Sequence, residues 1–103
     1  MKLPIDSGDY DNALACPKCG GQNLHHGCVM VFDRDEDDDT ELVTTVDHGY
    51  TVVKNYNAAT SYNPSARRHG LRIAMECESC GPLEDYALTV YQHKGCTFIE
   101  WKE

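Results

Sequence analysis

The sequence has no long hydrophobic run, few basic residues and no sustained helical periodicity. Its longest apolar run covers only residues 28–32, and its first residues lack the apolar stretch of a signal peptide. We therefore expect a cytoplasmic protein that does not engage a membrane. Apolar residues are nowhere spaced as in an amphipathic helix, and the two cysteine motifs described below are the only internal repeat, which argues against a helical bundle.

Basic residues are outnumbered by acidic ones. Nine Lys and Arg stand against seventeen Asp and Glu, which gives a formal net charge of −8. Proteins that bind nucleic acids or anionic membranes without specificity use Lys and Arg to neutralise phosphates, so this charge balance favours a protein partner instead. The 103 residues suffice for one domain with a modest core, which a bound metal would help to stabilise.

Two short cysteine motifs carry the clearest chemical signal. The first is C-P-K-C-G at residues 16–20, and the second is C-E-S-C-G at residues 77–81. Each C-x2-C turn places two thiolates at two corners of a metal tetrahedron, and the glycine that follows readily adopts a positive φ. We predict one structural Zn²⁺ per chain, with the four ligands Cys16, Cys19, Cys77 and Cys80.

Two alternatives to a zinc site stay open for these cysteines. Iron can occupy a site of four thiolates. Redox exchange at a C-x2-C pair is the other alternative, but it needs a thioredoxin-like βαβ context, and the pattern here does not provide one. In a reducing compartment, paired C-x2-C turns are more typical of metal ligands than of disulfides.

Other candidate ligands lie outside the two motifs. Cys28 and Cys96 are interpreted as small buried hydrophobic residues, with an alternative ligand or a redox-sensitive pair as the other hypotheses. His25 and His26 are adjacent on an expected strand and point to opposite faces, so at most one of them could be a ligand. No catalytic Ser/His/Asp order, phosphate-binding glycine loop or carboxylate pair can be placed on rigid elements, and we expect no enzymatic activity.

The fold is predicted to be all-β, an antiparallel sheet of five or six strands with a long inserted hairpin. Residues 1–15 are expected to form a flexible arm docked through Tyr10 and Leu14, and residues 16–103 a single domain. Four successive apolar residues near the end of 24–32 predict a strand buried on both faces. The remaining strands are expected at 42–46, 50–54, 70–76, 85–92 and 96–102.

The apolar pattern of the last two expected strands, 85–92 and 96–102, predicts the register in which they pair. A two-residue turn at 94–95 pairs Leu88 with Trp101 and Val90 with Ile99, which creates an uninterrupted apolar patch on one face. A three-residue loop would instead place a glutamate opposite a leucine. The apolar pattern therefore favours the shorter turn.

Residues 33–41 contain seven carboxylates in nine positions. Such a run repels itself and is expected to form a solvated hairpin loop outside the core. The ordering of an EF-hand calcium loop is missing. The alternative to a merely solvated loop is a docking surface for a basic protein, formed by Asp35, Glu36, Asp37, Asp38 and Asp39.

Residues 55–69 are predicted to form a polar loop that leads into a small basic cluster. The candidate nucleic-acid contacts in this cluster are Arg67, Arg68 and Arg72. They would contact phosphates while the nearby Tyr56 and Tyr62 stack on bases. The alternative is that the cluster neutralises the acidic run or the negative metal centre within the same molecule.

Each C-x2-C-G motif forms a metal-binding turn, or knuckle. The order of a first knuckle, several strands, a second knuckle and a final hairpin resembles the zinc-ribbon group over residues 16–102. The resemblance implies a β fold and a structural zinc, but no particular partner. Residues 63–73 and 92–101 are also similar to small uncharacterised proteins of phages and actinobacteria. Rubredoxins resemble the chain in their two C-x2-C-G knuckles, which hold iron, although fifty-seven residues separate Cys19 from Cys77 here, about twice their spacing.

These observations lead to one primary hypothesis and two alternatives. The primary one is a non-enzymatic zinc protein that acts as a protein-interaction module or adaptor. The first alternative is a nucleic-acid-binding zinc ribbon that uses the basic cluster. The second is a rubredoxin-like iron electron carrier.

Overall fold

The computed structural model describes residues 13–102. The predicted arm over residues 1–15, including Tyr10, therefore lies almost wholly outside the described residues. The elements in chain order are β1 (Leu24–Asp33), β2 (Thr40–Asp47), β3 (Tyr50–Asn57), the 3₁₀ turn η1 (Ala58–Thr60), β4 (Gly70–Cys77), β5 (Gly81–His93) and β6 (Cys96–Lys102). None of the described helical segments is long and apolar enough to cross a membrane.

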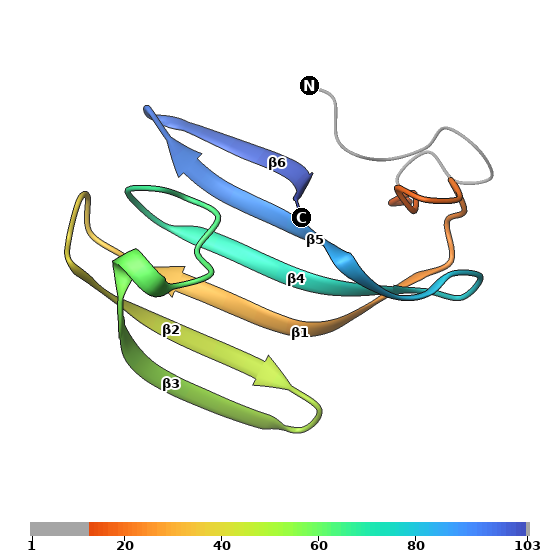
Figure 1. The fold of residues 1–103 in the computed structure, drawn as a ribbon, viewed down its shortest axis with the longest axis horizontal. Helices are drawn as coiled ribbons and strands as arrows, with labels where there is room; N and C mark the ends of the chain where they lie inside the picture. The colour runs from red at the N-terminus through yellow and green to blue at the C-terminus, as the bar shows by residue number, and fades with distance from the viewer. Residues whose placement is uncertain (1–12, 103) are drawn as a thin grey trace.

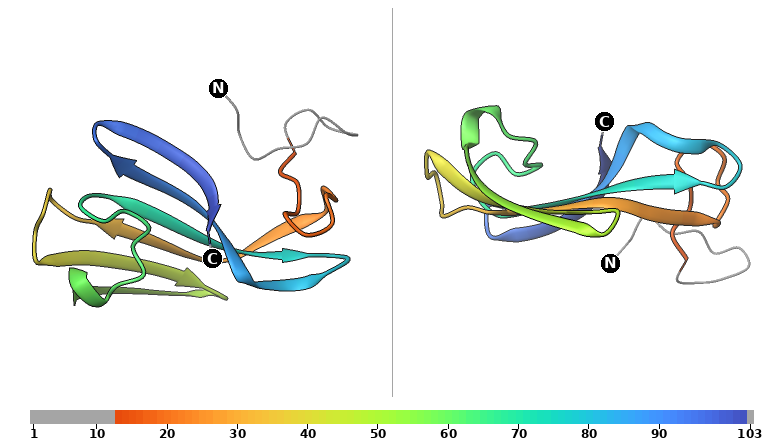
Figure 2. Two further views of the ribbon diagram at one scale, coloured as in Figure 1. Left: turned by 45° about the horizontal axis from the view of Figure 1, so that its top comes forward. Right: turned by 90° about the horizontal axis from the view of Figure 1, so that it is seen from below.

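The six strands form one antiparallel sheet in the order β3-β2-β1-β4-β5-β6 (Figure 1). This confirms the predicted all-β fold. The chain builds β1–β2–β3 and β4–β5–β6 as two meanders, and β1 pairs with β4 at the centre. Residues 58–69, the crossover loop, connect the two meanders and lie over one face of the sheet (Figure 2). We call this side the covered face and the opposite side the open face.

The register of the final hairpin is the one that the apolar pattern predicts. Leu88 pairs with Trp101 and Val90 with Ile99. Lys94 and Gly95 adopt φ values of 50° and 77°. Two successive positive φ values are typical of the type I′ turn, whose twist matches that of the flanking strands.

Both predicted loops are shorter in the structure than in the sequence-based assignment. The acidic turn covers residues 34–39 rather than 33–41, because β1 continues through Asp33 and β2 begins at Thr40. The polar loop begins at 58 rather than 55, because β3 continues until Asn57 pairs with Thr40. Ladder hydrogen bonds satisfy the backbone whether or not the side chains are polar, so pairing extends beyond the apolar segments.

The buried side chains of the central sheet lie on the covered face. Phe32, Val43, Ala87 and Thr89 are each at most 2% exposed. The expectation that residues 24–32 are buried on both faces is wrong, since Val31 is 43% exposed. Neighbouring residues of a strand point to opposite faces, and the crossover loop covers only one.

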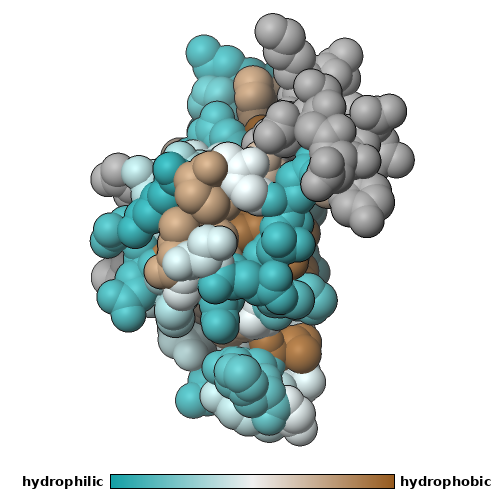
Figure 3. Space-filling view, turned by 90° about the vertical axis from the view of Figure 1, so that its right-hand side faces the viewer, coloured by the Kyte–Doolittle hydropathy of each residue, from teal (hydrophilic) through white to brown (hydrophobic). Residues whose placement is uncertain are grey.

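A second buried cluster lies at the base of the sheet, where both knuckles are. Cys16, Cys77 and Leu83 form its centre, and the side chains packed around them are Leu24, Met75, Tyr86 and Trp101. Viewed from this end, the described surface is mainly hydrophilic, with hydrophobic atoms between the polar groups (Figure 3). The fold thus has two small cores rather than one large one.

Candidate metal centre

Pairing of β1 with β4 brings the two cysteine motifs together. Leu24, at the start of β1, pairs with Cys77 at the end of β4, and Cys77 also pairs with Gly81. The loop that precedes β1 therefore lies beside the turn between β4 and β5. As a result, the Sγ atoms of the four predicted ligands lie within 4.8 Å of one another.

Local hydrogen bonds shape the first knuckle. The N–H of Gly20 donates to the carbonyl of Cys16 over 2.9 Å, and the N–H of Cys16 donates to the carbonyl of Gly21 over 2.8 Å. The backbone N–H groups of Lys18 and Gly21 point at the sulfurs of Cys16 and Cys19, each at 3.4 Å. Amides directed at sulfur stabilise thiolates, which are the form that binds a metal.

The glycines of the two knuckles have the conformation that their motif predicts. Gly20 and Gly81 adopt φ values of 75° and 80°. A residue with a Cβ atom would be strained in this left-handed region. The glycine that ends each motif therefore lets the chain turn sharply away from the sulfurs.

The arrangement of sulfurs fits a tetrahedral metal. A metal–sulfur bond of about 2.3 Å in a tetrahedron separates two sulfurs by about 3.8 Å, and the Sγ atoms of Cys19 and Cys77 are 3.7 Å apart. Cys16 and Cys77 are buried, whereas Cys19 and Cys80 are exposed. Four protein sulfurs complete a tetrahedron and leave no open position, which is typical of structural sites rather than catalytic ones.

The thiols of this cluster influence one another's ionisation. Hydrogen bonds from the backbone N–H groups of Cys80 and Ser79 lower the pKa of Cys77 to about 7. The hydrogen bond with the side chain of Cys19 and the loss of solvent raise the pKa of Cys80 to about 12. Four thiolates this close together repel one another, and a divalent cation removes that repulsion.

The other candidate ligands lie outside the cluster. Among the described residues, the four cysteines are the one group of His, Cys, Asp and Glu close enough to share a metal. His25 instead contacts Glu78, with 3.0 Å between Nε2 and Oε1. His26 lies on the surface of β1.

Cys28 and Cys96 differ from their predicted roles. Cys96 is exposed on the edge strand β6, so its interpretation as a buried hydrophobic residue is wrong, and Cys28 is only partly buried. Strands β4 and β5 lie between them. The three strand steps between β1 and β6 alone separate the two residues by about 14 Å, at about 4.8 Å per strand, which is too far for a disulfide within one chain.

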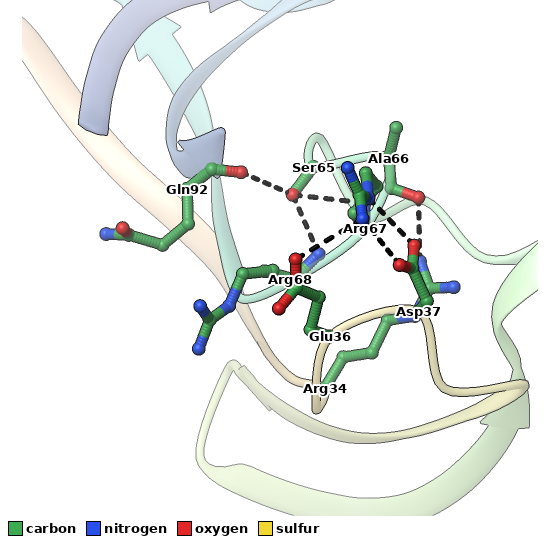
Figure 4. Close-up of polar contacts among 8 residues, drawn as sticks. All are labelled: Arg34, Glu36, Asp37, Ser65, Ala66, Arg67, Arg68 and Gln92. Carbon is green, nitrogen blue, oxygen red and sulfur yellow. Dashed lines mark hydrogen bonds and ion pairs between the residues drawn. The ribbon is translucent and has the colours of Figure 1, made fainter. Parts of the chain in front are cut away.

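The acidic turn is tied to the crossover loop by Arg67 and Arg34 (Figure 4). Arg67 binds both carboxylate oxygens of Asp37, at 2.8 Å and 2.6 Å, and reaches Glu36 at 3.3 Å. Arg34 donates from Nη1 to the carbonyl of Ala66 over 2.9 Å. The alternative in which the basic cluster neutralises the acidic run therefore holds for Arg67. The remaining predicted docking residues Asp35, Glu36, Asp38 and Asp39 are exposed.

Arg68 and Arg72 have different surroundings. Arg68 is exposed. Arg72 is partly buried on the covered face and lines a hollow together with Tyr62 and Lys102. The structure therefore separates the three arginines that the sequence groups together.

Two residues of the crossover loop that sequence reasoning misses hold the loop on the covered face. Ser65 is buried, and its Oγ donates to the carbonyl of Gln92 over 2.6 Å (Figure 4). Asn63 donates from Nδ2 to Oε2 of Glu41 over 2.9 Å, and its Oδ1 accepts the N–H of Ser65. The available signal was the Asn-Pro-Ser string at 63–65, because an asparagine before proline favours such a turn.

Glu41 corrects the view that the whole acidic run is solvated. Its side chain is only 2% exposed, and its Oε1 has no hydrogen-bond partner among the described residues. Strand β2 turns this residue to the covered face, under Asn63 of the crossover loop. One carboxylate of the run is thus part of the core.

Comparison with known proteins does not assign this chain to a family. The chain matches no known protein family, no curated protein and no solved structure. The functional argument therefore rests on the geometry of the site.

Proposed function

We propose that this chain is a non-enzymatic, zinc-ribbon-like protein in which one structural Zn²⁺ holds the base of the sheet. The observation that carries the proposal is the cluster of four Sγ atoms within 4.8 Å of one another. Zinc is the metal that structural Cys₄ sites of this spacing most often hold. When bound, it would supply a cross-link between the loop before β1 and the β4–β5 turn.

The protein's own residues prepare that cross-link. Backbone amides face the sulfurs of Cys16 and Cys19, and Leu83 packs beside Cys16 and Cys77. Cys16 and Cys77 form the buried side of the cluster, and Cys19 and Cys80 form the side that faces solvent. A metal in such a position stabilises the fold and has no site left for a substrate.

We further propose that the protein acts as an interaction module in the cytoplasm, with a basic protein as partner. The exposed carboxylates of Asp35, Glu36, Asp38 and Asp39 support this, as does the net charge of −8. The clasp by Arg67 and Arg34 gives the acidic turn a defined shape. Such a surface accelerates association with a positively charged partner.

Nucleic-acid binding is the second candidate. One observation favours it: Arg72, Lys102 and the 74% exposed Tyr62 line one hollow on the covered face. It predicts binding that weakens steeply with salt and that an Arg72→Ala/Tyr62→Ala variant loses. A rubredoxin-like carrier would be a red, iron-loaded protein, and a colourless sample that still binds its partner contradicts that third candidate.

The test is native mass spectrometry of protein purified gently from its own host, followed by metal analysis. We expect one zinc per chain, two free thiols and a retained protein partner that dissociates as salt rises. A chain without metal that carries disulfides would contradict the metal centre. Retained nucleic acid in place of a protein would favour the second candidate.

A further inference from the structure

Burial is distributed unequally between the two faces of the sheet. Every fully buried residue of the central sheet, Glu41 and Thr89 included, points to the covered face, where the crossover loop lies. Away from the base of the sheet, the open face carries no layer of described residues; at the base, the cluster of Cys16, Cys77 and Leu83 packs against Trp101. Domains are normally built from at least two packed layers, so a sheet with one apolar face uncovered is incomplete.

The open face is nevertheless the more apolar of the two. Strand pairing aligns two rows across all six strands. The first row, from β3 to β6, is Val53, Thr44, Val31, Leu71, Val90 and Ile99. The second is Thr51, Val46, Val29, Ile73, Leu88 and Trp101. Each row has five apolar side chains and one threonine, and neither has a charge.

These side chains are accessible to a partner. Val31, Val46 and Val53 are 43%, 47% and 55% exposed, and none of the apolar residues in the two rows is fully buried. The sheet is hollowed beside Val31, Leu71 and Val90, which line a shallow depression. An aliphatic surface this continuous marks an interface on soluble proteins.

The charges of the acidic turn are kept on the other side. Arg67 and Arg34 bind the acidic turn to the crossover loop, and the turn bends toward the covered face (Figure 2). A second copy of the chain could therefore approach the open face without bringing two acidic turns together. Asp33 lies beside the first row on the open face, where it pairs with Leu42 and contacts Nδ1 of His69 at 3.4 Å. The two rows themselves are uncharged, so they meet on two copies without unpaired charges.

We propose that the open face binds the open face of a second copy, which forms a twofold β-sandwich with the crossover loops outside. Sheets pack this way about 10 Å apart, with strands about 30° from alignment. The two rows cover about 400 Å² of flat sheet in each copy, from the strand spacing and rise. Over both copies this is about 800 Å², which neighbours such as Leu42 extend toward about 1,200 Å², where stable interfaces begin, so the expected dimer is one of micromolar affinity.

The test compares three proteins by sedimentation velocity from about 1 to about 100 µM. The wild type is expected to be a dimer. Val31→Glu/Val53→Glu places two charges on the open face at exposed positions, and we expect its dissociation constant to rise at least about a hundredfold. Tyr50→Glu/Tyr62→Glu is the matched control: it adds two charges at more exposed residues outside the open face and should leave the dimer intact.

Trp101 supplies a readout at the edge of the interface, where the second row meets the base cluster. It is the one tryptophan of the chain and lies in the second row. Its emission should shift to the blue as the wild type and the control dimerise, but not in Val31→Glu/Val53→Glu. Added salt should tighten the dimer by screening the −8 charge of each copy, whereas it would weaken a complex held by the acidic turn.

Three results would overturn the inference. They are a monomeric wild type at the highest concentration, a dimer that survives Val31→Glu/Val53→Glu, and a dimer whose formation leaves Trp101 emission unchanged. Metal content and the β-sheet circular dichroism of each variant are measured in parallel. If the double variant loses its sheet, Thr44→Glu takes its place, because this position between Val31 and Val53 already carries a polar side chain.

Discussion

Arg67 lowers the pH at which Asp37 of the acidic turn is protonated. The hydrogen bond from its guanidinium holds the pKa of Asp37 below the ordinary value of 3.8, and the same contact raises the pKa of Arg67. Because the pKa of Asp37 is lowered on folding, its stabilising contribution is present above the ordinary pKa and is lost as the pH falls through the lowered one. The contact between Arg67 and Asp37 should thus persist on acidification to a pH below that ordinary value.

Arg67→Gln removes that contact, and we expect the pKa of Asp37 to rise toward its ordinary value. The carboxyl chemical shift of Asp37, followed by NMR from neutral toward acidic pH in the wild type and the variant, measures this rise. Arg68→Gln is the control, since the contacts of Arg68 in this region come from its backbone. An unchanged pKa of Asp37 in Arg67→Gln would contradict the assignment.

The two cysteines outside the metal centre should differ in reactivity. Cys96 is exposed on β6, whereas Cys28 is partly buried. Burial, followed by the nearby carboxylate of Asp47, raises the pKa of the Cys28 thiol and lowers its thiolate fraction.

With iodoacetamide at neutral pH, we expect metal-loaded protein to be modified first at Cys96, then at Cys28, and last at the four clustered cysteines. A time course of peptide masses measures the order. Addition of a chelator should make the four clustered cysteines reactive. Early modification of Cys16 or Cys77 in protein incubated with zinc and without chelator would mean that these thiols bind no metal.

At the scale of elements, the crossover loop determines which face of the sheet is covered, and Gly70 permits its close approach. Gly70 is buried at the start of β4, and a Cβ atom there would collide with the side chains of Asn63 and Pro64. Asn63 in turn binds the side chain of Glu41 on β2 and accepts the backbone N–H of Ser65. The glycine therefore sets the distance between loop and sheet.

Gly70→Ala should force the loop outward and lower the free energy of unfolding by about 1 to 3 kcal/mol. Urea denaturation followed by circular dichroism measures the change. Gly27→Ala is the matched control in the neighbouring strand, where a Cβ atom meets only the carbonyl of Ala74 at 3.9 Å. Equal losses in the two variants would show that the loop contact contributes nothing specific.

At the scale of the whole molecule, stability depends on the base of the sheet. Of the six buried hydrophobic residues among those described, Cys16, Cys77 and Leu83 belong to the metal cluster. The other three, Phe32, Val43 and Ala87, form a thin layer beneath the crossover loop. A core this small rarely stabilises a domain without a cross-link.

Removal of the metal with a chelator should therefore unfold the sheet, or lower its melting temperature by about 10 °C or more, because metal binding and folding are coupled. Thermal melts with and without chelator measure the effect. Restored zinc should return the original melting temperature, which controls for damage by the chelator. An unchanged β-sheet spectrum and melting temperature would contradict a structural metal.

The sequence by itself determined the features that depend on near neighbours. Strand positions follow from alternation and β-branched residues, and the register of the last hairpin follows from the pairing of Leu88 with Trp101. The metal-ligand set could be predicted too, because each knuckle is a local turn with its own glycine. Glu41 was the exception within a local pattern, since composition does not reveal which carboxylate of a run faces inward.

Only the tertiary structure decided which face is covered and which charges are paired. Arg67 and Asp37 lie thirty residues apart, and their contact depends on the path of the crossover loop and on the pairing of β1 with β4. The apolar alternation of β4 and β5 puts their larger aliphatic side chains on the open face, so it does not predict that the loop packs on the other side. That choice arises from the few polar contacts of Asn63 and Ser65, and it leaves the charge-free rows exposed on the open face.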